Sequence, residues 1–577
     1  MMRMRIGRSR ERRMAWGRTA VVLAAWVPTL ACGDAPDPEP TPDPEVAEAD
    51  RYGGTAVIAG AVEISTFNPA ATHDALSQQI QQHAVLMTLL RSDEALRPVP
   101  YLAESWEIND DSTRVVFHLR RDVSWHDGEP TTARDVEFTF RALKDPEAAF
   151  PNAEWFEGWE GPELIDRYTI RFAVRPHAGL LAGWARLPIM PRHLMSDVEA
   201  AALATHEFGA NPVGNGPYRF AGRDVGGNII LEANDEFPAA LGGRPYLDRV
   251  VYRNVSEPQT QLAELRAGGV HLVQRVDATQ LERAGRDPAL IVEEVPSRAY
   301  GFIAWNGKRA LFQDPSMRRA LTMAIDRAEV IGAARHGLGT VANGPIGPWH
   351  PAYPTELTPI AHSEEAAIAA LEALGWTDTD RDGIRDRDGT PLAFEMVTTE
   401  NRTYSDVMTI VQAQLRQVGV DVTLRIMDGS ALIDAVTSPE RRFDAFVLEW
   451  EPDLVIDDRQ LFSCEAIGQA FQFASYCNEE LEPILQAIPS ARSNAEVDEL
   501  LRRYVEIVNR DQPFTFLYFA EDANVRRRDL RGVTHDIRGD LYGIARWWLH
   551  PAARGSAIAT AAPAAPDAAR PSPSTPF

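Results

Sequence analysis

A strand, a helix and a second strand are predicted to follow one another within residues 392–426 of this chain. Apolar residues alternate with others from Leu392 to Met396, as they do on one face of a strand. A helix is predicted over 404–418, Gly419 is placed to end it, and alternation resumes over 420–426. Such a unit needs a crossover between two parallel strands. The second half of the chain is therefore predicted to be α/β.

The first half mixes the same two kinds of element. Alternating apolar residues predict half-buried strands at 114–119 and 168–174. Thr132 with Asp135 three residues later predicts the start of a helix, and a capping box predicts another at Ser493. Since 577 residues exceed the usual size of one domain, we expect two or three lobes.

The N-terminus is typical of an export signal. Seven arginines precede or open a stretch of 13 mainly apolar residues, Thr19–Ala31, which is too short to span a bilayer. It ends in Thr29-Leu30-Ala31-Cys32, which resembles the lipobox of bacterial lipoproteins, although Thr29 stands where Leu is usual. Residues 1–31 are predicted to be a signal peptide and Cys32 a lipidated N-terminus. Cleavage without lipidation is the alternative.

The segments at the two ends of the mature chain are not expected to join a core. Proline occupies every second position near the start of 32–51, which predicts an extended acidic tether. Residues 552–577 are rich in Ala, Pro and Ser, and are predicted to be disordered.

Composition and cysteine content exclude some classes of function. A net charge of −25 opposes binding to phosphate backbones, so nucleic acid is not an expected partner. Apart from Cys32, the chain has only Cys464 and Cys477. In an oxidising compartment these two are predicted to form a disulfide, with two buried free thiols as the alternative.

A series of short motifs runs through the body between Tyr52 and Trp548. They are Pro100–Glu107, Phe117–Arg120, Trp125–Gly128, Thr132–Val136, Pro212–Tyr218, Ala304–Asn306, Arg318–Ala320, Ala324–Arg327, Asp378–Gly383, Ser463-Cys464 and Cys477-Asn478. In this order they resemble the family 5 solute-binding proteins of ABC importers, the group that contains dipeptide-, oligopeptide- and nickel-binding proteins.

The resemblance implies a bilobed periplasmic-binding-protein-like clamp, α/β in class, with an extra subdomain in the first lobe. The first lobe would comprise 52–90, 212–303 and 528–551, the inserted subdomain 91–211, and the second lobe 304–527. The chain would cross the hinge near 300–306 and 525–532.

The implied function is capture of a small ligand, expected to be a peptide, between the lobes and its delivery to an ABC permease with its ATPase subunits. The protein would be a monomer, lipid-anchored on the periplasmic side of the cell membrane or free in the periplasm. A sugar, a metal chelate or a signalling role are alternatives.

Four residues are the candidates for ligand contact. In peptide-binding relatives a Trp is followed three residues later by an Asp that pairs with the ligand's α-ammonium, and Trp450 and Asp453 have this spacing. Asn306, after Ala304-Trp305, and Phe67 lie on segments that face the ligand in the family. The alternatives are a surface carboxylate, a turn-capping Asn, and aromatic side chains in the core.

Asp378 begins an acidic loop that matches the first half of a calcium loop. Asp378, Asp380, Asp382 and Asp386 supply carboxylates and Ile384 a carbonyl, but the twelfth position is Gly389 instead of Glu. A structural calcium ion is one interpretation and a polar turn the other. No further cofactor is expected.

Two common motifs of hydrolases are absent from the sequence. The sequence contains neither Gly-x-Ser-x-Gly nor His-Glu-x-x-His, and a turn at Gly128 accounts for the neighbouring His126 and Asp127. The protein is therefore expected not to be an enzyme, and an exported hydrolase is the alternative from another class.

Overall fold

The computed structural model describes residues 46–554 except 62, 73, 157, 177, 178 and 492. The predicted signal peptide, Cys32 and most of the tether lie outside these residues, as does the tail beyond residue 554. Within the described range, no helix is both long and apolar enough to cross a bilayer.

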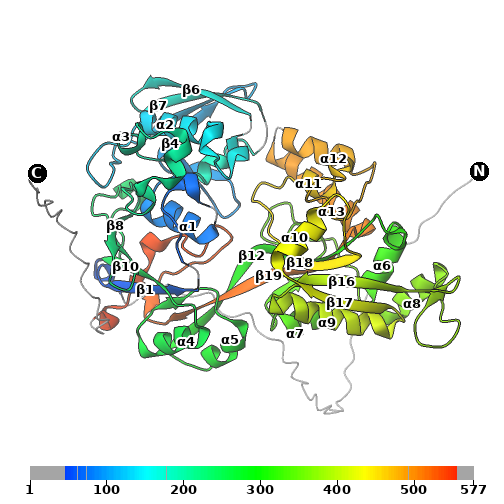
Figure 1. Cartoon of the computed structure of the whole chain (residues 1–577). Coiled ribbons are helices and arrows are strands. Elements are labelled where there is room, and N and C mark those ends of the chain that lie inside the picture. Colours follow the sequence, from blue (N-terminus) through cyan, green and yellow to red (C-terminus); the bar gives the residue numbers. More distant parts are fainter. Residues whose placement is uncertain are drawn as a thin grey trace, which may run out of the picture. The chain divides into compact units, whose positions relative to one another are not determined.

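An eleven-stranded mixed sheet extends through the body (Figure 1). In spatial order its strands are β17 (Asp421–Met427), β16 (Ala393–Thr399), β18 (Ala445–Trp450), β12 (Leu290–Trp305), β19 (Phe514–Arg527), β11 (Leu272–Val273), β1 (Thr55–Gly60), β10 (Arg249–Asn254), β9 (Ile229–Ala233) and β8 (Tyr218–Arg223), with β13 (Gly339–Val341) paired to β19.

The α-helices of the described residues are α1 (Ala75–Ile80), α2 (Ala133–Lys144), α3 (Arg192–Met195), α4 (Pro258–Ala267), α5 (Ala278–Gly285), α6 (Pro315–Met323), α7 (Arg327–Ala334), α8 (Glu364–Ala373), α9 (Arg402–Gln417), α10 (Gly429–Thr437), α11 (Arg459–Phe462), α12 (Glu482–Ala487) and α13 (Asn494–Asp511). Of these, α2, α9 and α13 are the helices predicted from capping residues and periodicity. The α2 helix has the predicted capping box, and Ser493 caps α13 through the amide of Glu496.

The predicted strand–helix–strand unit is β16, α9 and β17. The two strands pair in parallel, and α9 packs against both of them (Figure 1). Gly419 follows α9 with φ +84°, a conformation that glycine adopts without strain. The prediction of an α/β second half is confirmed.

A second, four-stranded sheet lies in the first half of the chain. Its order is β4 (Ala103–Ile108), β5 (Arg114–Leu119), β7 (Thr169–Val174) and β6 (Trp159–Asp166). Trp184 packs among its aromatic residues, with ring centroids 5.3 Å from Phe172 and 5.6 Å from Trp159. These side chains belong to one continuous buried cluster with residues of β1 and β9. The inserted region and the first lobe therefore share a core.

The buried side chains divide the body into two lobes. Two clusters surround β1, β8–β11 and the four-stranded sheet, and form the first lobe. Two others surround β16–β18, α6–α9 and α13, and form the second. Only β12 and β19 contribute to the cores of both lobes among the described strands.

The passage between the lobes is marked by a break in the pairing of β12 with β19. Leu290–Pro296 pairs with Glu521–Arg527, and pairing resumes between Tyr300 and Phe519 after a shift of register. Both passages lie earlier in their strands than the positions expected from the sequence. Proline has no amide hydrogen to donate, so Pro296 is suited to the end of the paired stretch. The predicted lobe boundaries themselves stay predictions.

Short ladders complete the strands. They are β2 (Leu90–Ser92) with β3 (Pro98–Pro100), β14 (Asp386–Arg387) with β15 (Thr390–Pro391), and β20 (Leu530–Arg531) with β21 (Trp548–Leu549).

Candidate functional site

A cavity of about 110 Å³ lies where segments of both lobes meet, and we call it the interlobe cavity. The first lobe supplies α1 with the π-helical turn that follows it (Gln81–Val85), β2 and the loop 536–542. The second lobe supplies Glu451 and Leu454 after β18, and β12 supplies Val295–Arg298 from the passage. Most of the lining is polar. A π-helical turn is rare, and such turns are frequent at functional sites.

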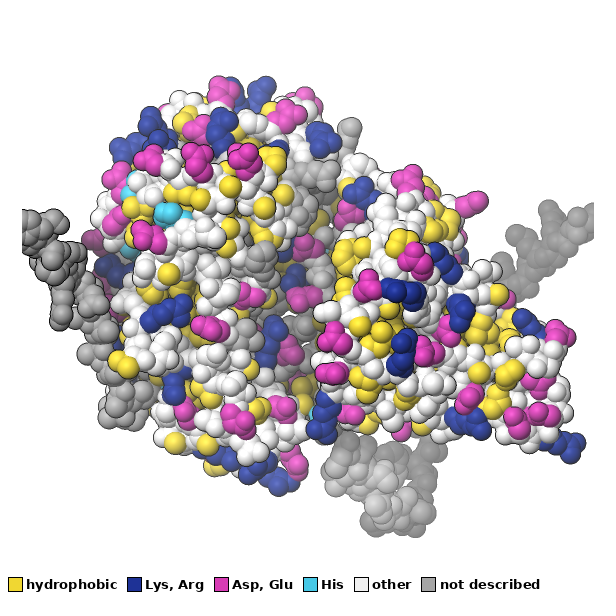
Figure 2. Space-filling model, viewed as in Figure 1, with side chains coloured by type: hydrophobic (Ala, Val, Ile, Leu, Met, Phe, Trp, Pro, Cys, Tyr) yellow, Lys and Arg dark blue, Asp and Glu magenta, His cyan; other side chains and the backbone are white. Residues whose placement is uncertain are grey.

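Charged side chains dominate the wall of this cavity. Five arginines and four carboxylates line it: Arg91, Arg186, Arg275, Arg298, Arg538, Glu451, Asp522, Asp536 and Asp540. The whole chain has 83 acidic and 58 basic residues. The cavity is therefore basic relative to the rest of the protein. On the face visible in Figure 2, acidic and basic side chains are interspersed.

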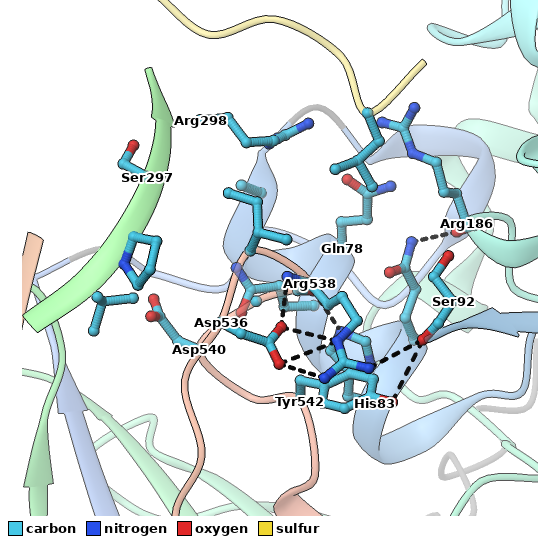
Figure 3. A pocket seen from close by; sticks show the side chains of 18 of the residues that line it. Gln78, His83, Ser92, Arg186, Ser297, Arg298, Asp536, Arg538, Asp540 and Tyr542 are labelled. Carbon is cyan, nitrogen blue, oxygen red and sulfur yellow. Dashed lines mark hydrogen bonds and ion pairs between the residues drawn. The ribbon is translucent and has the colours of Figure 1, made fainter. Parts of the chain in front are cut away.

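Asp453 lies beside the cavity and carries an ion pair between the lobes. Its carboxylate pairs with Arg186, which follows the turn Gly183–Ala185 of the first lobe. Arg298 lies 3.7 Å away and is itself paired with Glu451. The Asp453 side chain is 41% exposed, so a ligand could reach it. Figure 3 shows Arg186 and Arg298 on the same side of the cavity.

Arg186 is also positioned by its own lobe. Its guanidinium lies 4.2 Å from the ring centroid of Trp155, and its carbonyl accepts a hydrogen bond from Gln82. Cation–π contact and ion pairing both restrict the position of an arginine side chain. The side chain is thus held at the edge of the cavity.

Trp450 ends β18 and is half-buried. Its ring packs against Phe471 and Phe473, with centroids 5.6 and 6.2 Å away. Cys464 and Cys477 form the predicted disulfide, which confirms that prediction. Both phenylalanines lie in the loop that this bond closes. Phe471 is 42% exposed. The disulfide therefore fixes an aromatic surface next to the segment that carries Asp453.

The opposite wall of the cavity is a hydrogen-bonded group in the first lobe (Figure 3). Arg538 pairs with Asp536 and donates to the carbonyl of Ser92 at 3.2 Å. His83 contacts the carbonyl of Arg538 at 3.2 Å, and burial together with the Arg91 charge lowers the pKa of His83 to about 4. His83 is therefore neutral at neutral pH.

Arg275 contacts two acids at another edge of the cavity. It lies 3.6 Å from both Asp522 and Asp540, and Asn524 donates to Asp540 at 3.2 Å. Burial raises the pKa of Asp522, because a buried carboxylate loses hydration.

Two of the four predicted ligand contacts lie elsewhere. Phe67 is fully buried and packs against Phe220 at 5.3 Å, so it is a core residue. Asn306 is 1% exposed, donates to the carbonyls of Arg441 and Phe443 at 3.0 and 2.6 Å, and accepts from the amide of Lys308. It caps a turn, which was the alternative interpretation.

The acidic loop brings three of its predicted ligands together. Carboxylate oxygens of Asp378, Asp380 and Asp382 lie within 4.8 Å of one another, and all three residues are exposed. Each also accepts hydrogen bonds from amides of the same loop. Asp386 instead accepts from Thr379 at 2.9 and 2.7 Å, and the Ile384 side chain is buried. Calcium binding stays a prediction.

Sequence reasoning missed the arginines of the cavity. They come from β2, from the turn after Gly183–Ala185, from the residues after β11, from β12 and from the loop 536–542, which lie far apart in the chain. One local signal was present in the sequence, Pro296-Ser297-Arg298. A proline within a predicted strand marks an interruption of that strand, and this proline precedes the strand residues of the second lobe.

Comparison with known proteins gives the same picture at the level of the whole chain. The family model for bacterial extracellular solute-binding proteins, family 5 middle, matches residues 97–464. The oligopeptide-binding protein AppA of Bacillus subtilis is 30% identical over 505 residues, which cover 86% of this chain and 92% of that protein. The dipeptide-binding protein of Escherichia coli is 23% identical, with 82% and 90% covered.

The solved structure of AppA in complex with a nonapeptide superposes with a TM-score of 0.69 at 29% identity, and the match covers 87% of this chain and 99% of that one. The two-lobed architecture, the expected motifs and these matches agree. The chain belongs to the family 5 bacterial extracellular solute-binding proteins.

Proposed function

We propose that this protein binds a short peptide in the interlobe cavity and presents it to the permease of an ABC importer. The observation that carries the proposal is Asp453, a half-exposed carboxylate that lies beside the cavity on one lobe and pairs with an arginine of the other. Relatives named for oligopeptide and dipeptide binding support a peptide as the ligand.

Binding is proposed to proceed by exchange of ion pairs. The α-ammonium of the peptide takes the place of Arg186 at Asp453, and Arg186 turns to the ligand. Because a charge-assisted hydrogen bond is stronger in a water-poor cavity, the exchange favours the state in which both lobes contact the ligand. A ligand shifts the lobes only by as much as it prefers that state.

Replacement of Asp453 by Asn tests this role. We expect D453N to weaken the binding of free-amine peptides by about 10- to 100-fold, as for loss of a hydrogen bond to a charged group, and to leave the melting temperature within a few degrees. N-acetylated peptides are expected to bind both forms equally. Isothermal titration calorimetry with both peptide sets measures this.

Asp434→Asn is the matched control, because Asp434, on α10, forms an exposed ion pair with Arg442. Equal affinity of D453N and the parent protein for free-amine peptides would show that Asp453 is not the ammonium site. Cleavage of the peptides during the titration would contradict a purely binding role and favour a hydrolase.

The proposal extends to the setting of the protein. We infer that it is exported, lipid-anchored through Cys32, monomeric, and a partner of a permease with its ATPase subunits. The signal-like N-terminus supports export, and the family supports the partner. The protein would have no catalytic activity of its own.

A further inference from the structure

Four of the five arginines in the interlobe cavity have carboxylate partners. Arg538 pairs with Asp536, and Arg275 lies between Asp522 and Asp540. Arg298 pairs with Glu451. Arg186 pairs with Asp453. These pairs account for every carboxylate that lines the cavity among the described residues.

Arg91 is the fifth, and it differs from the others. Among the described residues no carboxylate forms an ion pair with it. Its Nη2 donates to the hydroxyl of Tyr101 at 2.8 Å, and its guanidinium lies 3.7 Å from the ring centroid of that tyrosine. Its Nε–H is buried without an acceptor. The guanidinium is therefore a half-buried cation with donors that the protein itself leaves unused.

The neighbours of Arg91 do not compensate its charge. Tyr101 is buried and neutral, since burial raises its pKa above the usual value. His83 is also neutral, because burial and Arg91 lower its pKa. A cation removed from water without a counter-ion is costly. The cost is offset if a bound ligand supplies the anion.

We propose that Arg91 is a carboxylate-binding residue of the interlobe cavity, and that the ligand carries a free carboxylate. This rests on the proposed function, and it names the class of ligand further: a molecule with an ammonium for Asp453 and a carboxylate for Arg91, which is a short zwitterionic peptide. A planar guanidinium matches a carboxylate in shape and charge.

The size and charge of the cavity agree with such a ligand. About 110 Å³ is small compared with the roughly 300–1,000 Å³ of typical ligand sites, so a long peptide requires the lobes to separate. With Asp453 included, five carboxylates stand against the five arginines, but two of them share Arg275, so Arg91 is the one arginine of the described lining without a carboxylate partner. A zwitterion with its ammonium at Asp453 and its carboxylate at Arg91 leaves the net charge of the cavity unchanged.

The test is a cycle that pairs one side chain with one group of the ligand. Tri-alanine with free ends and tri-alanine amide are titrated calorimetrically into the purified protein and into R91Q. Amidation is expected to weaken binding to the parent protein by at least tenfold and to have less than a twofold effect on R91Q. A metal chelate is the other source of the same chemistry, and nickel–histidine is titrated in parallel.

Two further variants test whether the effect of amidation depends on the guanidinium of Arg91. R91K keeps the charge without the planar fork and is expected to give an intermediate effect of amidation. R97Q is the matched control, because Arg97 lies in the turn between β2 and β3, is 65% exposed and pairs with Asp93. It is expected to behave as the parent protein does. Thermal melts identify any variant that fails to fold, in which case R91K replaces R91Q in the cycle.

The outcomes distinguish failure of the Arg91 assignment from failure of the proposed function. An equal effect of amidation on R91Q and on the parent protein overturns the assignment of Arg91 and leaves peptide binding intact. Nickel–histidine bound in place of tri-alanine, with loss in R91Q, keeps the carboxylate site and overturns the peptide. Binding of neither probe by the parent protein overturns the proposed function and the inference with it.

Discussion

Asp458 is a buried acid that the proposed function does not use. It is 5% exposed and accepts a hydrogen bond from the hydroxyl of Tyr504 at 2.7 Å. Burial raises its pKa from 3.8 to about 7, against the effect of the Tyr504 bond. The side chain therefore holds a proton in the folded protein at a pH where the unfolded chain has released it.

The consequence is a stability that falls as pH rises. From about pH 4 to pH 7 the folded state binds more protons than the unfolded state at this residue, so its contribution to the free energy of unfolding decreases by about 4 kcal/mol and is constant above pH 7. We expect D458N, which mimics the neutral acid, to be more stable than the parent protein at pH 8 and to match it near pH 4.

Urea unfolding of both forms at pH 4, 6 and 8 measures this difference. The difference between the two proteins isolates Asp458 from the other titrating groups, since those are common to both. A constant difference across this range would mean that Asp458 is ionised throughout in the folded state.

At the scale of elements, the structure of the loop that the disulfide closes could be predicted only in part from the sequence. The two cysteines predicted the bond, but the packing of Phe471 and Phe473 on Trp450 depends on how the loop returns to β18. Closing a loop of this length restricts the unfolded chain by about 3 kcal/mol.

We expect the double replacement of Cys464 and Cys477 by serine to lower the free energy of unfolding by about 2–4 kcal/mol, as measured by urea titration. The fluorescence of the protein should also change in the folded state, because Trp450 loses its fixed aromatic neighbours. Reduction of the parent protein is the control and should give the same loss. No change in either form would indicate that the loop is held by its packing alone.

Elements and site differ in how far the sequence predicts them. The α2 helix is predicted by its capping residues, and α9 by its periodicity and by Gly419. In each case the signal lies within or next to the helix itself. Phe67 and Asn306 could not be placed in this way, because their burial comes from residues 135 or more positions away in the chain. No local sequence signal marks Arg91, because its proposed role depends on the lack of a carboxylate partner among the described residues.

At the scale of the whole molecule, the inserted region and the first lobe form one packing unit. Trp184 is fully buried in their common core, within 5.1 Å of Phe156 and 5.3 Å of Phe172. The second lobe has its own core, in which Trp305 is equally buried. The protein is therefore expected to unfold in two calorimetric transitions without ligand.

Trp184→Ala should destabilise the first of these units by about 3–5 kcal/mol and leave the other transition in place. Trp305→Ala is the matched control and should lower only the transition of the second lobe. Differential scanning calorimetry measures both. A third transition, confined to the inserted region, would show that this region folds separately.

The strands that join the lobes have a mechanical consequence. β12 and β19 are hydrogen-bonded to each other on both sides of the break at Pro296–Tyr300. They therefore form a two-stranded ribbon and do not act as two independent strands. A ribbon resists sliding along its length and flexes most easily across its flat face. We therefore expect the lobes to open about a single axis, so that the two walls of the cavity keep the same relative orientation toward each incoming ligand.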